Sequence, residues 1–408
     1  MKRRSFLYHA SAFAGAGPTM LMASEGRSEP AEDLPAVLKR DLLPDRIRID
    51  SLSLFRRDGN WFVRARSADG AEGWAVAHPF RTEHCYPVFT KIVAPFFEGR
   101  DARDLEQLID EVFLSGSHYK MQGQLFWVAV AAAEFAVLDL LGKRSQLSAV
   151  ELLGGRKRDT IDLYIANSHR HLSPEESLQR IVASVDTIDA RAVKFKIGGR
   201  MKSTDQVPGR TEALIPIVAE ALHDRCTLYA DANSSYTSVD KAIQVGRMLE
   251  ANGFAFYEEP CPFDHLDETR AVADALEIPI AWGEQESSFW RFRKMIQSGG
   301  VQIPQPDLFY YGGLIRSLRV AQVAEKAGLD CTPHISGGGL GFLYMGIYAA
   351  CCPNPGPFQE YKGLSKNFPW QSSGTRIEVK GGSMTAPDGD GIGVTVDPEF
   401  LKGATQVP

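Results

Sequence analysis

The sequence predicts a parallel α/β barrel that follows an α+β domain, and three observations support this. From Thr160 onward, short apolar runs alternate with amphipathic helical stretches. Eight such runs at helix-sized intervals over about 200 residues favour a closed barrel over an open doubly wound sheet. An open sheet would also carry a glycine-rich phosphate-binding turn after its first strand, and residues 164–169 contain no glycine.

The first 40 residues are predicted to be an export signal and a linker. Arg3 and Arg4 precede a weakly apolar stretch from Phe6 to Ala23, a pattern that resembles the twin-arginine signal. The stretch is too short and too polar to be a stable membrane span, which needs about 20 mainly apolar residues. We therefore expect an exported, periplasmic protein. The alternative is a cytoplasmic protein with a disordered N-terminus.

Residues 45–157 are predicted to form the α+β domain. Period-two alternation of apolar residues predicts an antiparallel meander over 47–54, 61–66 and 73–77. Helical periodicity then predicts helices over 86–97, 105–114 and 124–141. The last of these is apolar enough to be buried on nearly every side. A sheet followed by helices is typical of an α+β domain.

Residues 158–365 are predicted to form the barrel, with helices between its strands. The strands are expected at 161–165, 192–197, 227–230, 255–257, 279–282, 301–303, 329–332 and 358–361. The C-terminal ends of barrel strands meet in one ring. Most of these strands end in ionisable or amide side chains, which are Lys194, Lys196, Asp231, Asn233, Glu258, Glu259, Glu284, Asp307, His334 and Glu360. Unpaired charges are costly to collect at an apolar barrel, so the ring is the candidate active site.

Three of these carboxylates have the spacing of a metal site. Asp231, Glu258 and Glu284 are 27 and 26 positions apart, which is one strand–helix repeat each. Three oxygen ligands on adjacent strands suit Mg²⁺. A zinc site is disfavoured because the one strand-end histidine lies on a later strand. A metal-free ion network with Lys194 and Lys196 is the alternative, although it would leave excess negative charge.

Composition excludes several other classes of protein. The net charge of -6 is not typical of a nucleic-acid-binding protein. Six cysteines without a CxxC pair exclude a disulfide scaffold and a zinc ribbon. A small or acidic ligand must therefore be bound by a local site.

Together these runs resemble the enolase superfamily, specifically its mandelate racemase group. The resemblance is carried by Lys194-Phe195-Lys196, Asp231-Ala232-Asn233, Tyr257-Glu258-Glu259-Pro260, Gly283-Glu284, Pro306-Asp307, His334 and Phe358-Gln359-Glu360. It implies a modified TIM barrel of the (β/α)7β type over 158–365. It also implies that 45–157 is a capping domain, to which 366–408 returns.

The resemblance also implies roles for the ring residues. Lys196 would remove a proton next to a substrate carboxylate, and His334, oriented by Asp307, would act from the opposite face. Lys194 would lie near that carboxylate, and Glu360, if protonated, would donate a hydrogen bond to the developing oxyanion. One Mg²⁺ on Asp231, Glu258 and Glu284 would stabilise the enediolate, with Glu259 and Asn233 in support. Mutual repulsion between the two lysines is expected to leave one partly neutral.

The reaction after proton removal stays open. We expect a small carboxylate substrate, and favour dehydration of a sugar acid, because Asn167, His169 and His171 after the first strand could hold a polyol chain. Racemisation or epimerisation of a 2-hydroxy acid, and cycloisomerisation of an anhydro sugar acid, use the same first step. Asp307 disfavours the muconate cycloisomerase type, which has lysine there. A non-catalytic sugar-acid-binding protein is the remaining alternative, and family analogy predicts a homo-oligomer.

Overall fold

The computed structural model describes residues 35–202, 204–339, 341–363, 370–372 and 377–408. The predicted twin-arginine signal lies outside these residues. Val37 and Leu38, within the segment predicted as a linker, are buried, and their N–H groups donate to the Glu106 carboxylate.

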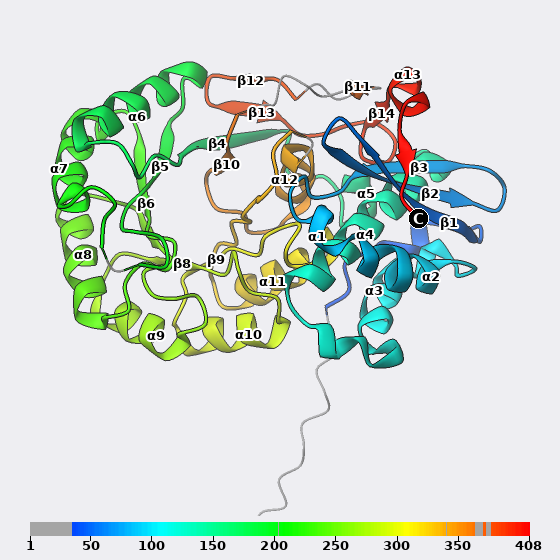
Figure 1. The fold of residues 1–408 in the computed structure, drawn as a ribbon, viewed down its shortest axis with the longest axis horizontal. Helices are drawn as coiled ribbons and strands as arrows, with labels where there is room; N and C mark the ends of the chain where they lie inside the picture. Colours follow the sequence, from blue (N-terminus) through cyan, green and yellow to red (C-terminus); the bar gives the residue numbers. More distant parts are fainter. Residues whose placement is uncertain (1–34, 203, 340, 364–369, 373–376) are drawn as a thin grey trace, which may run out of the picture. The chain divides into compact units, whose positions relative to one another are not determined.

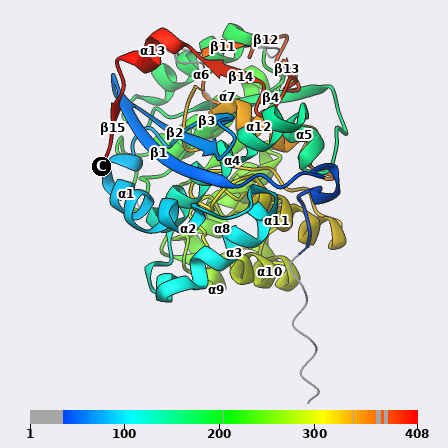
Figure 2. The same ribbon diagram turned by 90° about the vertical axis from the view of Figure 1, so that its right-hand side faces the viewer.

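An antiparallel sheet forms the first part of the structure. Strands β1 (Ile49–Arg57), β2 (Asn60–Ser67) and β3 (Glu72–Val76) form the predicted meander. Short β15 (Thr405–Gln406) pairs with β1, so the C-terminal segment joins this sheet (Figure 2). The helices that follow β3 are α1 (Thr82–Val88), α2 (Ala94–Phe97), α3 (Leu105–Leu114), α4 (Gln124–Ser145) and α5 (Ala149–Leu152). We call β1–β3, β15 and α1–α5 the cap.

The second part is a parallel sheet with helices between its strands (Figure 1). Its strands are β4 (Thr160–Asn167), β5 (Ala192–Lys196), β6 (Thr227–Asp231), β7 (Phe256–Glu258), β8 (Ile280–Trp282), β9 (Ile303–Pro304) and β10 (Gln359–Tyr361). Its helices are α6 (Pro174–Ile188), α7 (Arg210–Leu222), α8 (Val239–Ala251), α9 (Leu266–Ala275), α10 (Phe289–Ser298), α11 (Leu314–Lys326) and α12 (Gly341–Cys351). Strand order runs β10-β4-β5-β6-β7-β8-β9.

The strand predicted over 329–332 does not form as a strand. The chain there makes one isolated parallel bridge, between Asp307 and His334. Thr332 and His334 donate to the carbonyls of Pro304 and Pro306, but these two prolines have no N–H to donate in return, so no full ladder forms. The bridge still places His334 beside Asp307 at the end of the sheet.

The last elements return from the parallel sheet to the cap. They are β11 (Trp370–Ser372), β12 (Val379–Lys380), β13 (Ser383–Thr385), β14 (Val394–Val396) and α13 (Pro398–Lys402). β13 pairs antiparallel with β4, and β14 pairs with β11. The chain then reaches β15 at the edge of the cap sheet.

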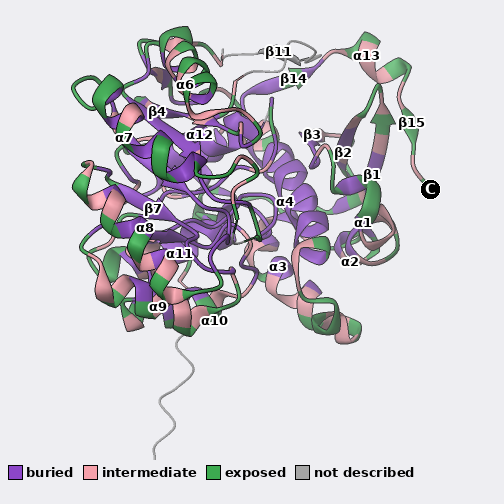
Figure 3. Ribbon diagram, turned by 60° about the vertical axis from the view of Figure 1, so that its left-hand side comes forward, coloured by how far each residue is buried: buried purple, intermediate pink, exposed green. Residues whose placement is uncertain are grey.

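Helix α4 is the central element of the cap and is buried along almost its whole length (Figure 3). It is long and apolar enough to cross a membrane, but 94% of the apolar window is buried inside the protein, as expected of a core helix. Two carboxylates on α4 are also buried. Asp139 accepts hydrogen bonds from the N–H groups of Trp74 and Ile392, and so joins β3 to the returning C-terminal segment.

The second buried carboxylate of α4, Glu134, binds the start of α11. Its two oxygens accept the N–H groups of Leu314 and Ile315, each at 2.7 Å. These N–H groups begin a helix and have no partner within it. Gly313 permits this contact, since it has φ 108° and a Cβ there would lie 1.4 Å from Glu134 Oε2. The cap and the parallel sheet are therefore joined by a buried hydrogen-bonded link.

We expect Glu134→Ala to lower the free energy of unfolding by about 2–6 kcal/mol. The substitution leaves two buried N–H groups without acceptors, and each costs about 1–3 kcal/mol. Urea unfolding followed by circular dichroism measures the change. Glu134→Gln keeps an acceptor and is expected to lose less. Equal stability of Glu134→Ala and wild type would show that the link contributes nothing.

Candidate active site

Strand register brings the predicted site residues together. Lys196 on β5 lies opposite Asp231 on β6, and Asp231 lies opposite Glu258 on β7. Lys194 and Lys196 alternate with Phe195 and so share one face of β5. Glu284 follows two residues after the end of β8. Three neighbouring strands therefore deliver a lysine and two carboxylates to the same end of the sheet.

The three predicted metal ligands form one buried cluster. One carboxylate oxygen each from Asp231, Glu258 and Glu284 lies within 4.8 Å of the other two. Burial and the Asp231 carboxylate raise the pKa of Glu258 against the opposing effect of Lys194. Burial opposes ionisation of Asp231, but Lys196 and Lys194 outweigh it and hold the pKa of Asp231 below its usual range. A divalent cation would offset the repulsion between these carboxylates, and the three hard oxygen ligands suit Mg²⁺.

The two lysines each contact a different carboxylate of the cluster. Lys194 Nζ donates to both oxygens of Glu258, at 2.7 and 2.9 Å, and Lys196 Nζ pairs with Asp231. Burial lowers the pKa of Lys194, but Glu258 and Glu360 outweigh it and raise that pKa well above its usual value. Repulsion between the two lysines was expected to lower a lysine pKa, but the pKa of Lys194 is raised. Lys194 therefore remains an ammonium.

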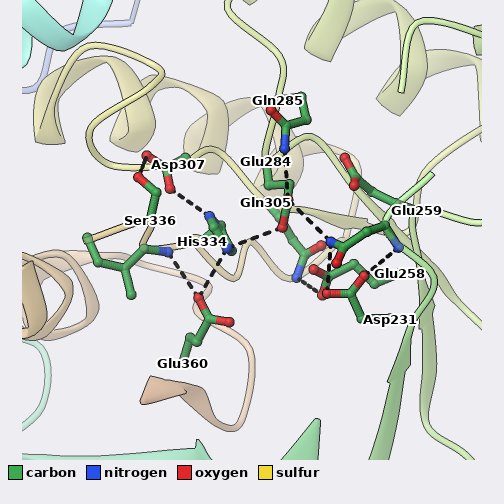
Figure 4. A network of polar contacts seen from close by, with 12 residues as sticks. Asp231, Glu258, Glu259, Glu284, Gln285, Gln305, Asp307, His334, Ser336 and Glu360 are labelled. Atoms are coloured by element: carbon green, nitrogen blue, oxygen red, sulfur yellow. Dashed lines mark hydrogen bonds and ion pairs between the residues drawn. The ribbon is translucent and has the colours of Figure 1, made fainter. Parts of the chain in front are cut away.

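Glu284 faces a different set of partners (Figure 4). Its Oε1 accepts from Gln285 Nε2 at 2.9 Å and from Asn233 Nδ2 at 3.4 Å. Its Oε2 lies 3.2 Å from His334 Nε2. The amide groups hold one oxygen of Glu284 and leave the other directed into the site.

Asp307 contacts His334, as the resemblance to the enolase superfamily implies. The distance from His334 Nδ1 to Asp307 Oδ2 is 2.6 Å, and Ser336 Oγ donates to the other oxygen of Asp307 at 2.9 Å. Burial lowers the pKa of His334, but Glu284 and Glu360 outweigh it and raise that pKa. The dyad leaves Nε2 of His334 as the nitrogen that faces the carboxylate cluster.

Glu360 differs from the expectation of a protonated donor. Burial disfavours its carboxylate, but Lys194, Lys362 and His334 outweigh burial and hold the pKa of Glu360 well below its usual value. Lys194 Nζ and Lys362 Nζ lie 3.1 Å from its two oxygens, and the Ile335 N–H also donates to it. Glu360 is therefore an acceptor here.

Two predicted supporting residues have structural contacts of their own. Asn167 points away from the cluster, since its amide contacts Ser184 on α6 and accepts the His169 N–H. Glu259 is buried behind the ligands, where Ser234 Oγ donates to it at 3.3 Å. Of the supporting residues, only Asn233 contacts the ligands directly, through both Asp231 and Glu284.

Besides Gln285, which donates to Glu284, sequence reasoning missed three residues of the site. Lys362 lies 3.2 Å from His334 Nε2, Gln305 Nε2 donates to Glu258 at 3.0 Å, and Ser336 binds Asp307. Each is two positions from a predicted residue at a strand end. Side chains two apart share a face of an extended chain, and this spacing could have identified them.

Known proteins match this sequence. The sequence profile of the family described as enolase C-terminal domain-like matches residues 176–400. An arabinonate dehydratase of Saccharolobus solfataricus is 27% identical over 81% of this chain and 86% of its own length. A D-galactarolactone cycloisomerase of Agrobacterium fabrum is 27% identical over 85% of this chain and 91% of its own.

Solved structures match as well. A racemase candidate of Roseobacter denitrificans is 33% identical, with a TM-score of 0.81 and coverage of 88% of this chain and 99% of its own. A mandelate racemase/muconate lactonizing protein of Paracoccus denitrificans, complexed with magnesium, is 26% identical, with a TM-score of 0.79 and coverage of 88% and 98%. These structures support a TIM-barrel-like fold with a capping domain. The chain therefore belongs to the mandelate racemase group of the enolase superfamily and is an enzyme of the lyase or isomerase type.

Proposed function

We propose that the protein dehydrates a sugar acid to a 2-keto-3-deoxy acid. The observation that carries this proposal is the position of two proton-transfer groups on different sides of one carboxylate cluster. Lys196 contacts Asp231. His334 lies on the other side of the cluster and contacts Glu284 (Figure 4). Relatives named arabinonate dehydratase, L-talarate/galactarate dehydratase and D-galactonate dehydratase, at 24–27% identity, support the substrate class.

Asp231, Glu258 and Glu284 would hold one Mg²⁺, with Asn233 and Gln305 fixing their orientation. When bound, the metal would supply a Lewis acid for the substrate carboxylate. The site would take that carboxylate beside Lys194, whose ammonium donates to it.

Lys196 would act as the base. Its Nζ accepts the proton from the substrate carbon next to the carboxylate, and the electron pair of that C–H bond moves into an enediolate. Lys196 must be neutral to do this.

His334 would act as the acid in the second step. Its Nε2 gives a proton to the 3-hydroxyl, the C3–O bond breaks, and water leaves as the C2–C3 double bond forms. The resulting enol then becomes the 2-keto acid. Asp307 accepts a hydrogen bond from Nδ1 and so keeps the ring in this orientation.

An isomerase is the second candidate. If His334 returns its proton to the same carbon, the substrate is racemised or epimerised. The Roseobacter denitrificans racemase candidate, at 33% identity, favours this alternative, and the Agrobacterium fabrum relative is a cycloisomerase. All three reactions begin with the same proton abstraction.

We also propose that the parallel strands close into a (β/α)7β barrel. Its support is the Asp307–His334 bridge at one edge and the hydrogen bond from Ile335 N–H to Glu360 on β10 at the other. The segment around His334 would then occupy the position of the seventh strand.

Exchange in D₂O tests the proposed reaction. The protein is incubated with Mg²⁺ and a library of aldonic and aldaric acids, and products are followed by NMR and a keto-acid assay. We expect one or more acids to give a 2-keto-3-deoxy product. His334→Asn is expected to keep exchange at the α-carbon while product formation falls by about 10²- to 10⁴-fold, because only the acid is removed.

The other outcomes separate the alternatives. Deuterium at the α-carbon with inversion and no keto product would replace the dehydratase by an isomerase. Absence of exchange across the whole library would contradict both.

A further inference from the structure

The orientation of Glu284 depends on the side chain that follows it. Gln285 Nε2 donates to Glu284 Oε1 at 2.9 Å, which leaves Oε2 directed into the site (Figure 4). The carbonyl of the same Gln285 amide is thereby directed away from Glu284. One amide can thus link the carboxylate to a donor on its far side.

That donor comes from the cap. Gln124 Nε2 donates to Gln285 Oε1 at 2.5 Å, and Gln124 is the first residue of α4. Two hydrogen bonds in series therefore run from the cap to a predicted metal ligand. The two glutamines are 161 positions apart in the sequence.

Contacts along α4 hold its first turn in place. Trp127 stacks against the guanidinium of Arg316 on α11, with 3.5 Å between Arg316 Cζ and the ring centroid. Glu134 binds the start of the same helix. Gln124 is therefore presented from a helix that is anchored to α11 at two further points.

The seam around the two glutamines is otherwise loosely filled. A cavity of about 720 Å³ lies beside them and is lined from the cap by residues 121–126 and from the sheet by Phe263, Asp264 and residues 285–287. Close packing does not fix Gln285 on this side, so its hydrogen bonds must.

We infer that Gln124 and Gln285 are positioning residues that couple the docking of the cap to metal binding at Glu284. This inference rests on the proposed metal site. The hydrogen bond from Gln285 determines which oxygen of Glu284 would face the cation. The hydrogen bond from Gln124 fixes the orientation of the Gln285 amide. Because coupling between two events is reciprocal, bound Mg²⁺ in turn strengthens the attachment of the first turn of α4.

Isothermal titration of the full-length protein with Mg²⁺ alone tests the inference. Methionine is close to glutamine in volume and cannot form these bonds, so the variants are Gln124→Met, Gln285→Met and the double variant. We expect Gln285→Met to weaken Mg²⁺ binding by about 10- to 100-fold and Gln124→Met to weaken it by a smaller factor. The double variant should bind like Gln285→Met, because Gln124 acts through Gln285.

Gln122→Met is the matched control, since Gln122 lines the same cavity and its side chain makes no hydrogen bond within the part of the chain that the structure describes. It should bind like wild type, and circular dichroism checks that every variant is folded. Hydrogen exchange gives a second readout, in which Mg²⁺ slows exchange at 121–127 in wild type and not in Gln124→Met.

Three results decide the matter. Wild-type protein that does not bind Mg²⁺ would overturn the proposed metal site itself. Wild type that binds, with Gln124→Met binding equally well, would overturn the coupling alone. Multiplying effects in the double variant would also overturn it, since the two residues would then act independently.

Discussion

Lys196→Met is expected to lower the rate of α-proton exchange by about 10²- to 10⁴-fold, the usual contribution of a positioned general base. In the structure, Lys196 contacts Asp231 at the edge of the carboxylate cluster, where a bound substrate would lie. Methionine keeps the apolar stem and removes the amine. Exchange of the substrate α-proton in D₂O, measured by NMR for each enantiomer, gives the rate.

The control for Lys196 is Lys241→Met on α8. Lys241 pairs with Glu212 at the surface, so Lys241→Met removes an ion pair that is far less buried than the pair of Lys196 with Asp231. Exchange of the substrate α-proton should therefore stay unchanged. Full exchange of either enantiomer by Lys196→Met would show that another group takes the proton.

Glu284→Gln is expected to lower kcat by about 10³-fold and to remove the stabilisation by Mg²⁺. A metal contributes several kcal/mol of charge stabilisation, and each 1.36 kcal/mol corresponds to about tenfold in rate. Wild-type protein should unfold at a higher temperature as Mg²⁺ is added, since the ion binds only the folded state. The variant should show no such rise.

Chelation provides the comparison for Glu284→Gln. Wild type treated with EDTA should lose the same activity and recover it when Mg²⁺ returns, whereas the variant should not recover. A variant that keeps both full activity and the Mg²⁺-dependent rise in melting temperature would remove Glu284 from the metal site.

Much of the site could be predicted because a repeating fold converts sequence spacing into position. Asp231 and Glu258 are one strand–helix repeat apart, and the register places them side by side. The predicted strand at 329–332 did not form, yet His334 still reached Asp307 through a single bridge. A position at a strand end thus depends less on full strand pairing than on the order of the segments.

The remaining features depended on tertiary contacts that no local pattern records. Side chains alternate between the two faces of β4, and Asn167 does not lie on the inward face. Its amide therefore contacts α6 instead of the site. The charge of Glu360 depends on Lys194 on β5 and on Lys362, which follows β10. To predict the hydrogen bond between Gln124 and Gln285, one would need to know where α4 begins relative to β8.

The two buried carboxylates of α4 have a consequence for exchanging parts between relatives. Asp139 and Glu134 bind the returning C-terminal segment and the start of α11, so α4 carries contacts that belong to the other part of the chain. A chimera that imports a whole foreign cap must also match those partners.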